Sequence, residues 1–106
     1  MAEFPENLAQ CTGFQWDASN SDKNWELHHV SRAEAEQVFF NRPILVASDP
    51  KHSGLEPRFA ALGQTNDRRR LLLIFTIRES TLIRVISARD QSREERRIYA
   101  QAQAKE

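Results

Sequence analysis

The chain has 106 residues, 40% of them hydrophobic, and its 15 Lys and Arg residues balance 15 Asp and Glu residues. This length supports one domain with a modest core, and no apolar run approaches the roughly 20 residues of a membrane span. A single cysteine excludes an internal disulfide, and the first dozen residues lack the charged start and apolar centre of a signal peptide. We therefore expect a soluble, cytoplasmic protein with an N-terminal tail over residues 1–13 and one domain over 14–106.

Charge is distributed unevenly between the two parts of the chain. Residues 1–67 carry ten Asp or Glu and five Lys or Arg, whereas residues 68–106 carry five acidic and ten basic residues, nine of them arginine. Arginine is preferred over lysine where phosphate or carboxylate is bound in a bidentate geometry. The pattern favours an anionic partner, either nucleic acid or an acidic protein, about as strongly as it favours neutralisation of one half by the other.

Two capped helices are expected in the N-terminal part, after a short alternating edge strand at 14–16. Asp17 is placed to cap a helix that continues to about His28, because its carboxylate can accept the free amide donors of the first turn. Ser31 and Glu34 have the spacing of a capping box, which opens a second helix ending at residue 39 or 40. The core-facing residues of the second helix would be Ala35, Val38 and Phe39.

The rest of the chain predicts strands and one further helix. Strands are expected at 44–47 and 56–63, and an apolar hairpin with a break at Glu79 and Ser80 is expected between Arg69 and Arg89. A capping box at Ser92 and Glu95 opens a C-terminal helix whose inner stripe would be Ile98, Tyr99 and Ala102. This order predicts an α+β domain with an antiparallel sheet of four to five strands, two N-terminal helices and one C-terminal helix, and the helices on one face.

The candidate chemistry consists of one carboxylate and several arginines. Glu56 and Arg58 lie two residues apart and would share a strand face, while Arg78, Arg84 and Arg89 come from the neighbouring hairpin. A carboxylate or imidazole could take the proton from a ribose 2′-hydroxyl while guanidinium groups stabilise the phosphorane-like transition state. By residue type alone, a plain Glu56–Arg58 ion pair on a sheet is the commoner outcome.

Metal and cofactor sites have little support. His28 and His29 are adjacent, so on a helix they diverge by about 100° and cannot chelate one ion. The sequence has no Cys/His spacing of the zinc type and no glycine-rich phosphate loop. We expect neither a metal nor a cofactor.

Several motifs in one order and spacing resemble the BrnT family of toxins. They are Phe14-x-Trp16-Asp17, Asn24, His28, Val30-Ser31 with Glu34-Ala35, Val38-Phe39, Glu56-x-Arg58-x-x-x-Leu62-Gly63, Phe75-Thr76-x-Arg78, Arg84-Val85-Ile86-Ser87-Ala88-Arg89 and Glu95-Arg96-x-x-Tyr99. The resemblance covers nearly the whole chain, from Phe14 to Tyr99. Its most specific part is the segment from Val85 to Arg89 followed by Glu95-Arg96.

The resemblance implies a RelE-like fold and a metal-independent endoribonuclease toxin of a type II toxin–antitoxin system. Such a toxin cleaves cellular RNA, inhibits translation and is neutralised by a BrnA-like antitoxin, and it meets DNA only through the antitoxin complex. The residues matched to catalytic positions are Glu56, Arg58, His28, Arg84 and Arg89, with the identity of the base left open between Glu56 and His28. The RNA-binding candidates are Arg78, Lys23, Arg69 and Arg70.

The chain also departs from the family pattern. The family usually has lysine where this chain has Asn20 and Leu27, and glycine where it has His29, which would leave the first helix without its usual left-handed cap. These departures motivate an alternative: a non-catalytic toxin homologue that binds the antitoxin and acts as a co-repressor. A plain RNA-binding domain, with salt-sensitive binding and no turnover, is a third reading.

Overall fold

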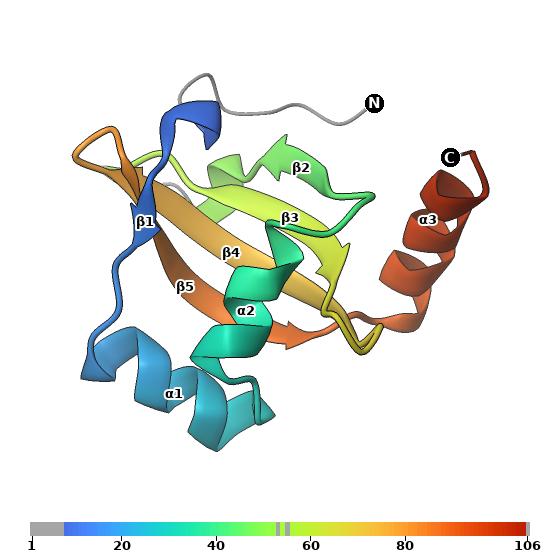
Figure 1. Ribbon diagram of the computed structural model, residues 1–106, viewed down its shortest axis with the longest axis horizontal. Coiled ribbons are helices and arrows are strands. Elements are labelled where there is room, and N and C mark those ends of the chain that lie inside the picture. The colour runs from blue at the N-terminus through green and yellow to red at the C-terminus, as the bar shows by residue number, and fades with distance from the viewer. Residues whose placement is uncertain (1–7, 53, 55, 106) are drawn as a thin grey trace.

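The computed structural model describes residues 8–52, 54 and 56–105, and this part of the chain forms a five-stranded sheet with three α-helices (Figure 1). The elements are β1 (Gly13–Phe14), α1 (Ala18–His28), α2 (Arg32–Val38), β2 (Leu45–Ser48), β3 (Phe59–Gln64), β4 (Arg70–Arg78), β5 (Leu82–Asp90) and α3 (Arg93–Ala104), with 3-10 turns at Leu8–Gln10 and Pro50–His52. The expected α+β class is confirmed. Residues 1–7 of the expected tail lie outside the described residues.

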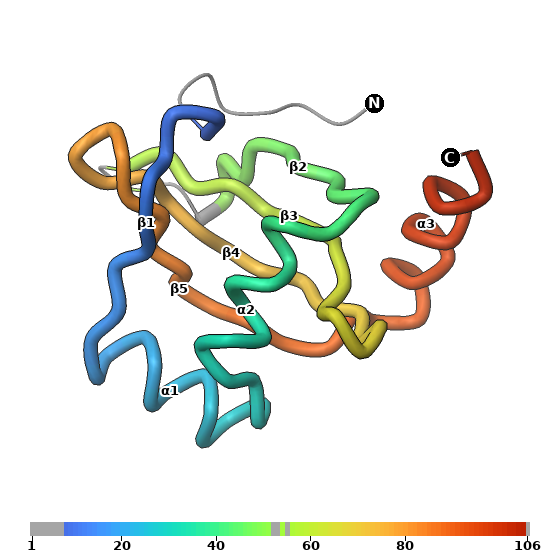
Figure 2. The backbone as a smooth tube through the Cα atoms, viewed as in Figure 1, coloured from blue at the N-terminus to red at the C-terminus, as the bar shows by residue number. Residues whose placement is uncertain are grey.

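The sheet is mixed, in the order β1-β5-β4-β3-β2. Four strands are antiparallel as predicted, but β1 runs parallel to β5, with Gly13 opposite Leu82. Figure 2 shows these two segments side by side although they are far apart in sequence. No hairpin joins them, so no turn forces them to be antiparallel.

The helices lie on both faces of the sheet, and the expectation of one face is wrong. On the first face, which carries Leu71, Leu73 and Phe75, the sheet packs against α2, whereas α1 lies along the edge of β5. α3 instead stands beside Leu62 and Leu72, whose side chains point to the opposite face. Buried Gln91 fixes the connection to α3, because its Nε2 donates to the carbonyl oxygens of Gly63 and Leu71.

The core between the first face and the helices is closely packed. Its buried residues include Val30, Ala35, Val38, Val46, Ala61, Leu71, Leu73, Phe75, Val85 and Ala88. The approach of α2 to β3 requires a glycine, since a Cβ on Gly63 would come within 2.6 Å of Val38 Cγ1.

All three predicted helix caps are confirmed. Asp17, Ser31 and Ser92 each accept a backbone N–H of the first turn, and each closes a capping box. The expected loss of the left-handed cap after α1 is wrong. His29 itself takes that conformation (φ 53°, ψ 41°), and its N–H donates to Trp25 O.

Two predicted details need correction. Ile98 does not belong to the inner stripe of α3, because it is 41% exposed. Tyr99 is fully buried and its hydroxyl donates to Pro43 O at 2.6 Å, and this contact fixes the rotation of the helix. The strand expected at 56–63 begins only at Phe59, since Pro57 has no N–H to donate to a ladder.

In the part of the chain that is described, the helices are too short or too polar to cross a membrane.

Candidate active site

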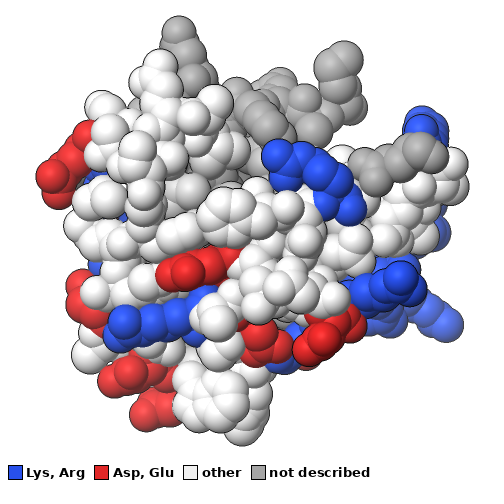
Figure 3. All heavy atoms as spheres, in the orientation of Figure 1, with Lys and Arg blue, Asp and Glu red and all other residues white. Residues whose placement is uncertain are grey.

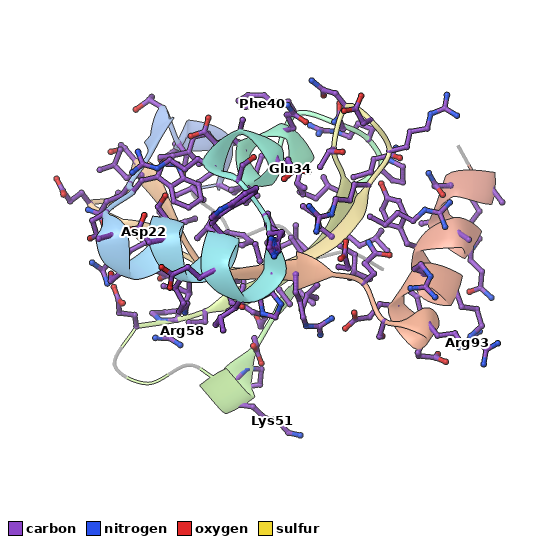
Figure 4. All side chains as sticks on the ribbon, turned by 90° about the horizontal axis from the view of Figure 1, so that it is seen from below. Asp22, Glu34, Phe40, Lys51, Arg58 and Arg93 are labelled. Atoms are coloured by element: carbon purple, nitrogen blue, oxygen red, sulfur yellow. The ribbon has the colours of Figure 1, made fainter. Side chains whose placement is uncertain are left out.

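The strand register gathers polar side chains on the second face of the sheet, opposite α2. Thr76 on β4 faces Arg84 on β5, and Arg58 lies one residue beyond the Phe59–Phe75 pair, so it stands on the other side of Thr76. Figure 4 shows labelled Arg58 below the sheet, on the side away from Glu34 and Phe40 of the α2 region. Strands β4 and β5, together with the residue before β3, therefore place Arg58, Thr76 and Arg84 in one row.

One step towards the end of the sheet, Glu56 and Arg78 form a bidentate ion pair. Arg78 Nε donates to Glu56 Oε2 at 2.8 Å and Arg78 Nη2 donates to Oε1 at 2.9 Å. The Arg78 side chain is 38% exposed and that of Glu56 is 39% exposed. Arg78, with smaller contributions from Arg58 and Arg84, lowers the pKa of Glu56, so this carboxylate is ionised at neutral pH. The expected pair of Glu56 with Arg58 is thus replaced by one with Arg78.

Arg84 is fixed by the start of α1. It is buried, its Nη1 and Nη2 donate to the Asp17 carboxylate at 3.1 and 3.2 Å, and Nη2 also donates to Ser19 Oγ at 2.9 Å. The Arg84 guanidinium holds the pKa of Asp17 well below its usual range. The same aspartate therefore caps α1 and positions an arginine of the site.

Gln15 connects the two arginines. Its Oε1 accepts from Arg78 Nη1 at 3.3 Å and from Arg84 Nη1 at 3.2 Å, which holds both guanidinium groups around one oxygen. The sequence reasoning did not include Gln15 or Ser19 in the site and treated Asp17 only as a cap. The alternation Gln15-x-Asp17-x-Ser19 was the available signal. We call Gln15, Asp17, Glu56, Arg58, Arg78 and Arg84 the arginine cluster.

Two of the residues matched to catalytic positions lie elsewhere. Arg89 is at the other end of β5, five residues from Arg84 or about 16 Å along the strand, and it pairs with Glu95 at 2.8 and 3.0 Å. His28 is at the C-terminal end of α1, where its backbone oxygen accepts from Arg69. The fold therefore brings together Glu56, Arg58 and Arg84, but not His28 or Arg89.

The candidate RNA-binding residues are likewise divided. Arg78 is part of the arginine cluster, whereas Lys23 is exposed on α1. Arg69 joins α1, α2 and β5, because it donates to Glu34, to Asp90 and to two backbone oxygens at the C-terminal end of α1. Arg70 donates to Gln103 of α3. Arg69 and Arg70 thus hold elements together at the end of the sheet away from the cluster.

A sequence model described as the ribonuclease toxin BrnT of a type II toxin–antitoxin system matches residues 16–95. The chain belongs to the BrnT family. The matched segment contains every strand from β2 to β5 and all members of the arginine cluster except Gln15. No curated protein matches the chain. Membership of the BrnT family implies an RNA target and a protein antitoxin as partner.

Proposed function

We propose that this chain is a metal-independent endoribonuclease toxin that acts in the cytoplasm, inhibits translation and is neutralised by a BrnA-like antitoxin. The observation that carries the proposal is the arginine cluster, in a member of a ribonuclease toxin family. The cluster combines three guanidinium groups with the two ionised carboxylates of Asp17 and Glu56, and the remaining positive charge suits a negatively charged phosphodiester.

Glu56 is the base that the geometry favours. It would accept the proton of a ribose 2′-hydroxyl, whose oxygen then attacks the phosphorus; the 5′-oxygen leaves with a proton from water, and a 2′,3′-cyclic phosphate remains. Arg58, Arg78 and Arg84 would stabilise the added negative charge in the transition state. Because Arg78 engages both oxygens of Glu56, the RNA phosphate must first draw Arg78 away to free the carboxylate.

The test uses two arginines that both pair with a glutamate. Arg78 pairs with Glu56 inside the cluster, and exposed Arg97 pairs with Glu94 on α3. In buffer containing EDTA, the native protein should cleave RNA, Arg78→Ala should lose activity by about 10²- to 10³-fold, and Arg97→Ala should keep it. Intact RNA with the native protein, or equal activity in both variants, would contradict the proposal.

A non-catalytic role as antitoxin-binding co-repressor has one observation in its favour. Arg84 is only 8% exposed and is already engaged by Asp17, Ser19 and Gln15, so little of its guanidinium faces solvent. Under this alternative, expression of the chain without antitoxin would not arrest growth, and Glu56→Gln would change nothing. The chain would still increase the affinity of the antitoxin for its operator DNA.

A further inference from the structure

An apolar groove lies between α3 and the second face of the sheet. It has a volume of about 590 Å³. Its floor contains Leu45, Leu62 and Leu72, which the register places in one row across β2, β3 and β4. The next row contains Ala47 and Ala60, whose small side chains deepen the floor. Contiguous apolar surface is uncommon on monomeric proteins, and where it occurs it often marks an interaction site.

The groove stays open because α3 is anchored from its other side. Tyr99 is fully buried with its hydroxyl on Pro43 O, and Gln103 accepts from Arg70, while Ile98 faces the groove and remains 41% exposed. Apolar side chains of α3 and of the sheet thus face each other without closing together. A partner that inserts apolar side chains between them would bury both surfaces.

The charges around the groove favour an acidic partner. Lys105 and Glu95 line it, and Glu95 is paired with Arg89 at the end of the leucine row, while α3 adds Arg93, Arg96 and Arg97 against Glu94, so the basic side chains around the groove outnumber the acidic ones. Figure 3 shows basic side chains gathered over α3, whereas the face over α1 and α2 mixes both signs. A twofold dimer through this groove would bring two basic helices together, which disfavours a second copy as occupant.

We propose that the groove binds a segment of the antitoxin that presents apolar side chains flanked by Asp or Glu. This inference rests on the proposed antitoxin partner and specifies where it docks. The groove and the arginine cluster lie on the same face of the sheet, where Leu72 in the groove and Thr76 between Arg58 and Arg84 are four residues apart on β4, about 13 Å. A segment lying along the sheet from the groove therefore covers Arg58 and Arg84, and neutralisation follows from occlusion of the site.

The first experiment compares adjacent residues of β2 that point to opposite faces. Ala47 and Ser48 are both exposed, but only Ala47 lines the groove. Each variant is co-expressed and purified with the protein encoded beside the gene of this chain, and the affinity is measured by calorimetry. Ala47→Trp should fill the groove and weaken binding about tenfold or more, whereas Ser48→Trp should bind as the native chain does.

A second pair tests the helix wall of the groove. Ile98 on α3 and Leu27 on α1 are both exposed, and only Ile98 faces the groove. Ile98→Asp should abolish neutralisation, and Leu27→Asp should not, with urea unfolding checked for both. Equal binding by all four variants, or no binding of the neighbouring protein by the native chain, would overturn the inference.

Cleavage separates this inference from the proposed function. Without antitoxin, Ile98→Asp should cleave RNA at the native rate, because the substitution lies away from the arginine cluster. If the native chain cleaves no RNA while Ala47→Trp and Ile98→Asp still lose the antitoxin, the docking site stands and the nuclease proposal fails. If cleavage occurs and all variants bind equally, the nuclease stands and the docking site fails.

Discussion

At the end of α1, His29 occupies a left-handed backbone conformation (φ 53°) that glycine adopts without steric cost. A residue with a Cβ is strained there, although the His29 ring compensates in part through an edge contact with Trp25, with ring centroids 5.3 Å apart. The strain is therefore local to one position, and it can be measured by changing that position alone.

We expect His29→Gly to be more stable than His29→Ala by about 1 kcal/mol, because both lose the ring contact but only glycine relieves the strain. The free energy of unfolding in urea measures the difference. Ala33, exposed in α2, supplies the reverse control, since Ala33→Gly should be destabilised by about 1 kcal/mol in a helix. If glycine is less stable than alanine at position 29, as it should be at position 33, then His29 is not strained.

At the scale of elements, α1 is joined to β5 by asparagine side chains. The short strand β1 pairs with Leu82 and Ile83, and beyond them no strand among the described residues pairs with this edge of β5. There, Asn20 Nδ2 donates to Val85 O at 2.9 Å, and Asn24 Oδ1 accepts from Ala88 N at 3.1 Å. Both asparagines are buried, and α1 thus satisfies backbone groups that an exposed edge would leave open.

Asn24→Ala should destabilise the protein by about 1–3 kcal/mol, because the buried N–H of Ala88 loses its acceptor. Exposed Glu26, on the same helix, is the control: Glu26→Ala should stay within about 0.5 kcal/mol of the native chain. Chemical denaturation of both variants measures the difference. If Asn24→Ala unfolds at the native denaturant concentration, α1 is not held by this bond.

At the scale of the whole molecule, ion pairs join elements that are distant in sequence. Arg84 binds Asp17, Arg78 binds Glu56, Arg69 binds Asp90, and Arg89 binds Glu95. In each pair the arginine lowers the pKa of its carboxylate partner. The folded protein therefore binds fewer protons than the unfolded chain in the acidic range.

Because these carboxylate pKa values are lower in the folded state, their contribution to stability is complete above the ordinary carboxyl pKa of about 4. It should be lost as the pH falls through the lowered values, so the urea midpoint should decrease steadily below about pH 5. Glu95→Gln, which keeps an acceptor for the Ser92 cap, should lower stability at neutral pH and weaken the pH dependence. A midpoint that is constant between neutral and acidic pH would contradict this account.

Local signals were sufficient for much of the fold. Capping boxes at Ser31 and Ser92, the aspartate cap at Asp17 and the apolar hairpin depend on neighbours within a few residues, so the sequence alone determined these helices and strands. The α+β class and the family resemblance follow from their order. Glu56, Arg58, Arg78 and Arg84 could also be nominated from residue type and alternation along strands.

Only the tertiary structure decided what depends on contacts between distant segments. The parallel pairing of β1, the placement of α3 on the second face and the shared contacts of Gln15 arise from packing that no local pattern encodes. His28 and Arg89 are separated from Glu56 for the same reason, since the length of β5 and the direction of α1 set where each side chain lies. Sequence thus supplied the chemical groups, and the register of the sheet selected which of them meet.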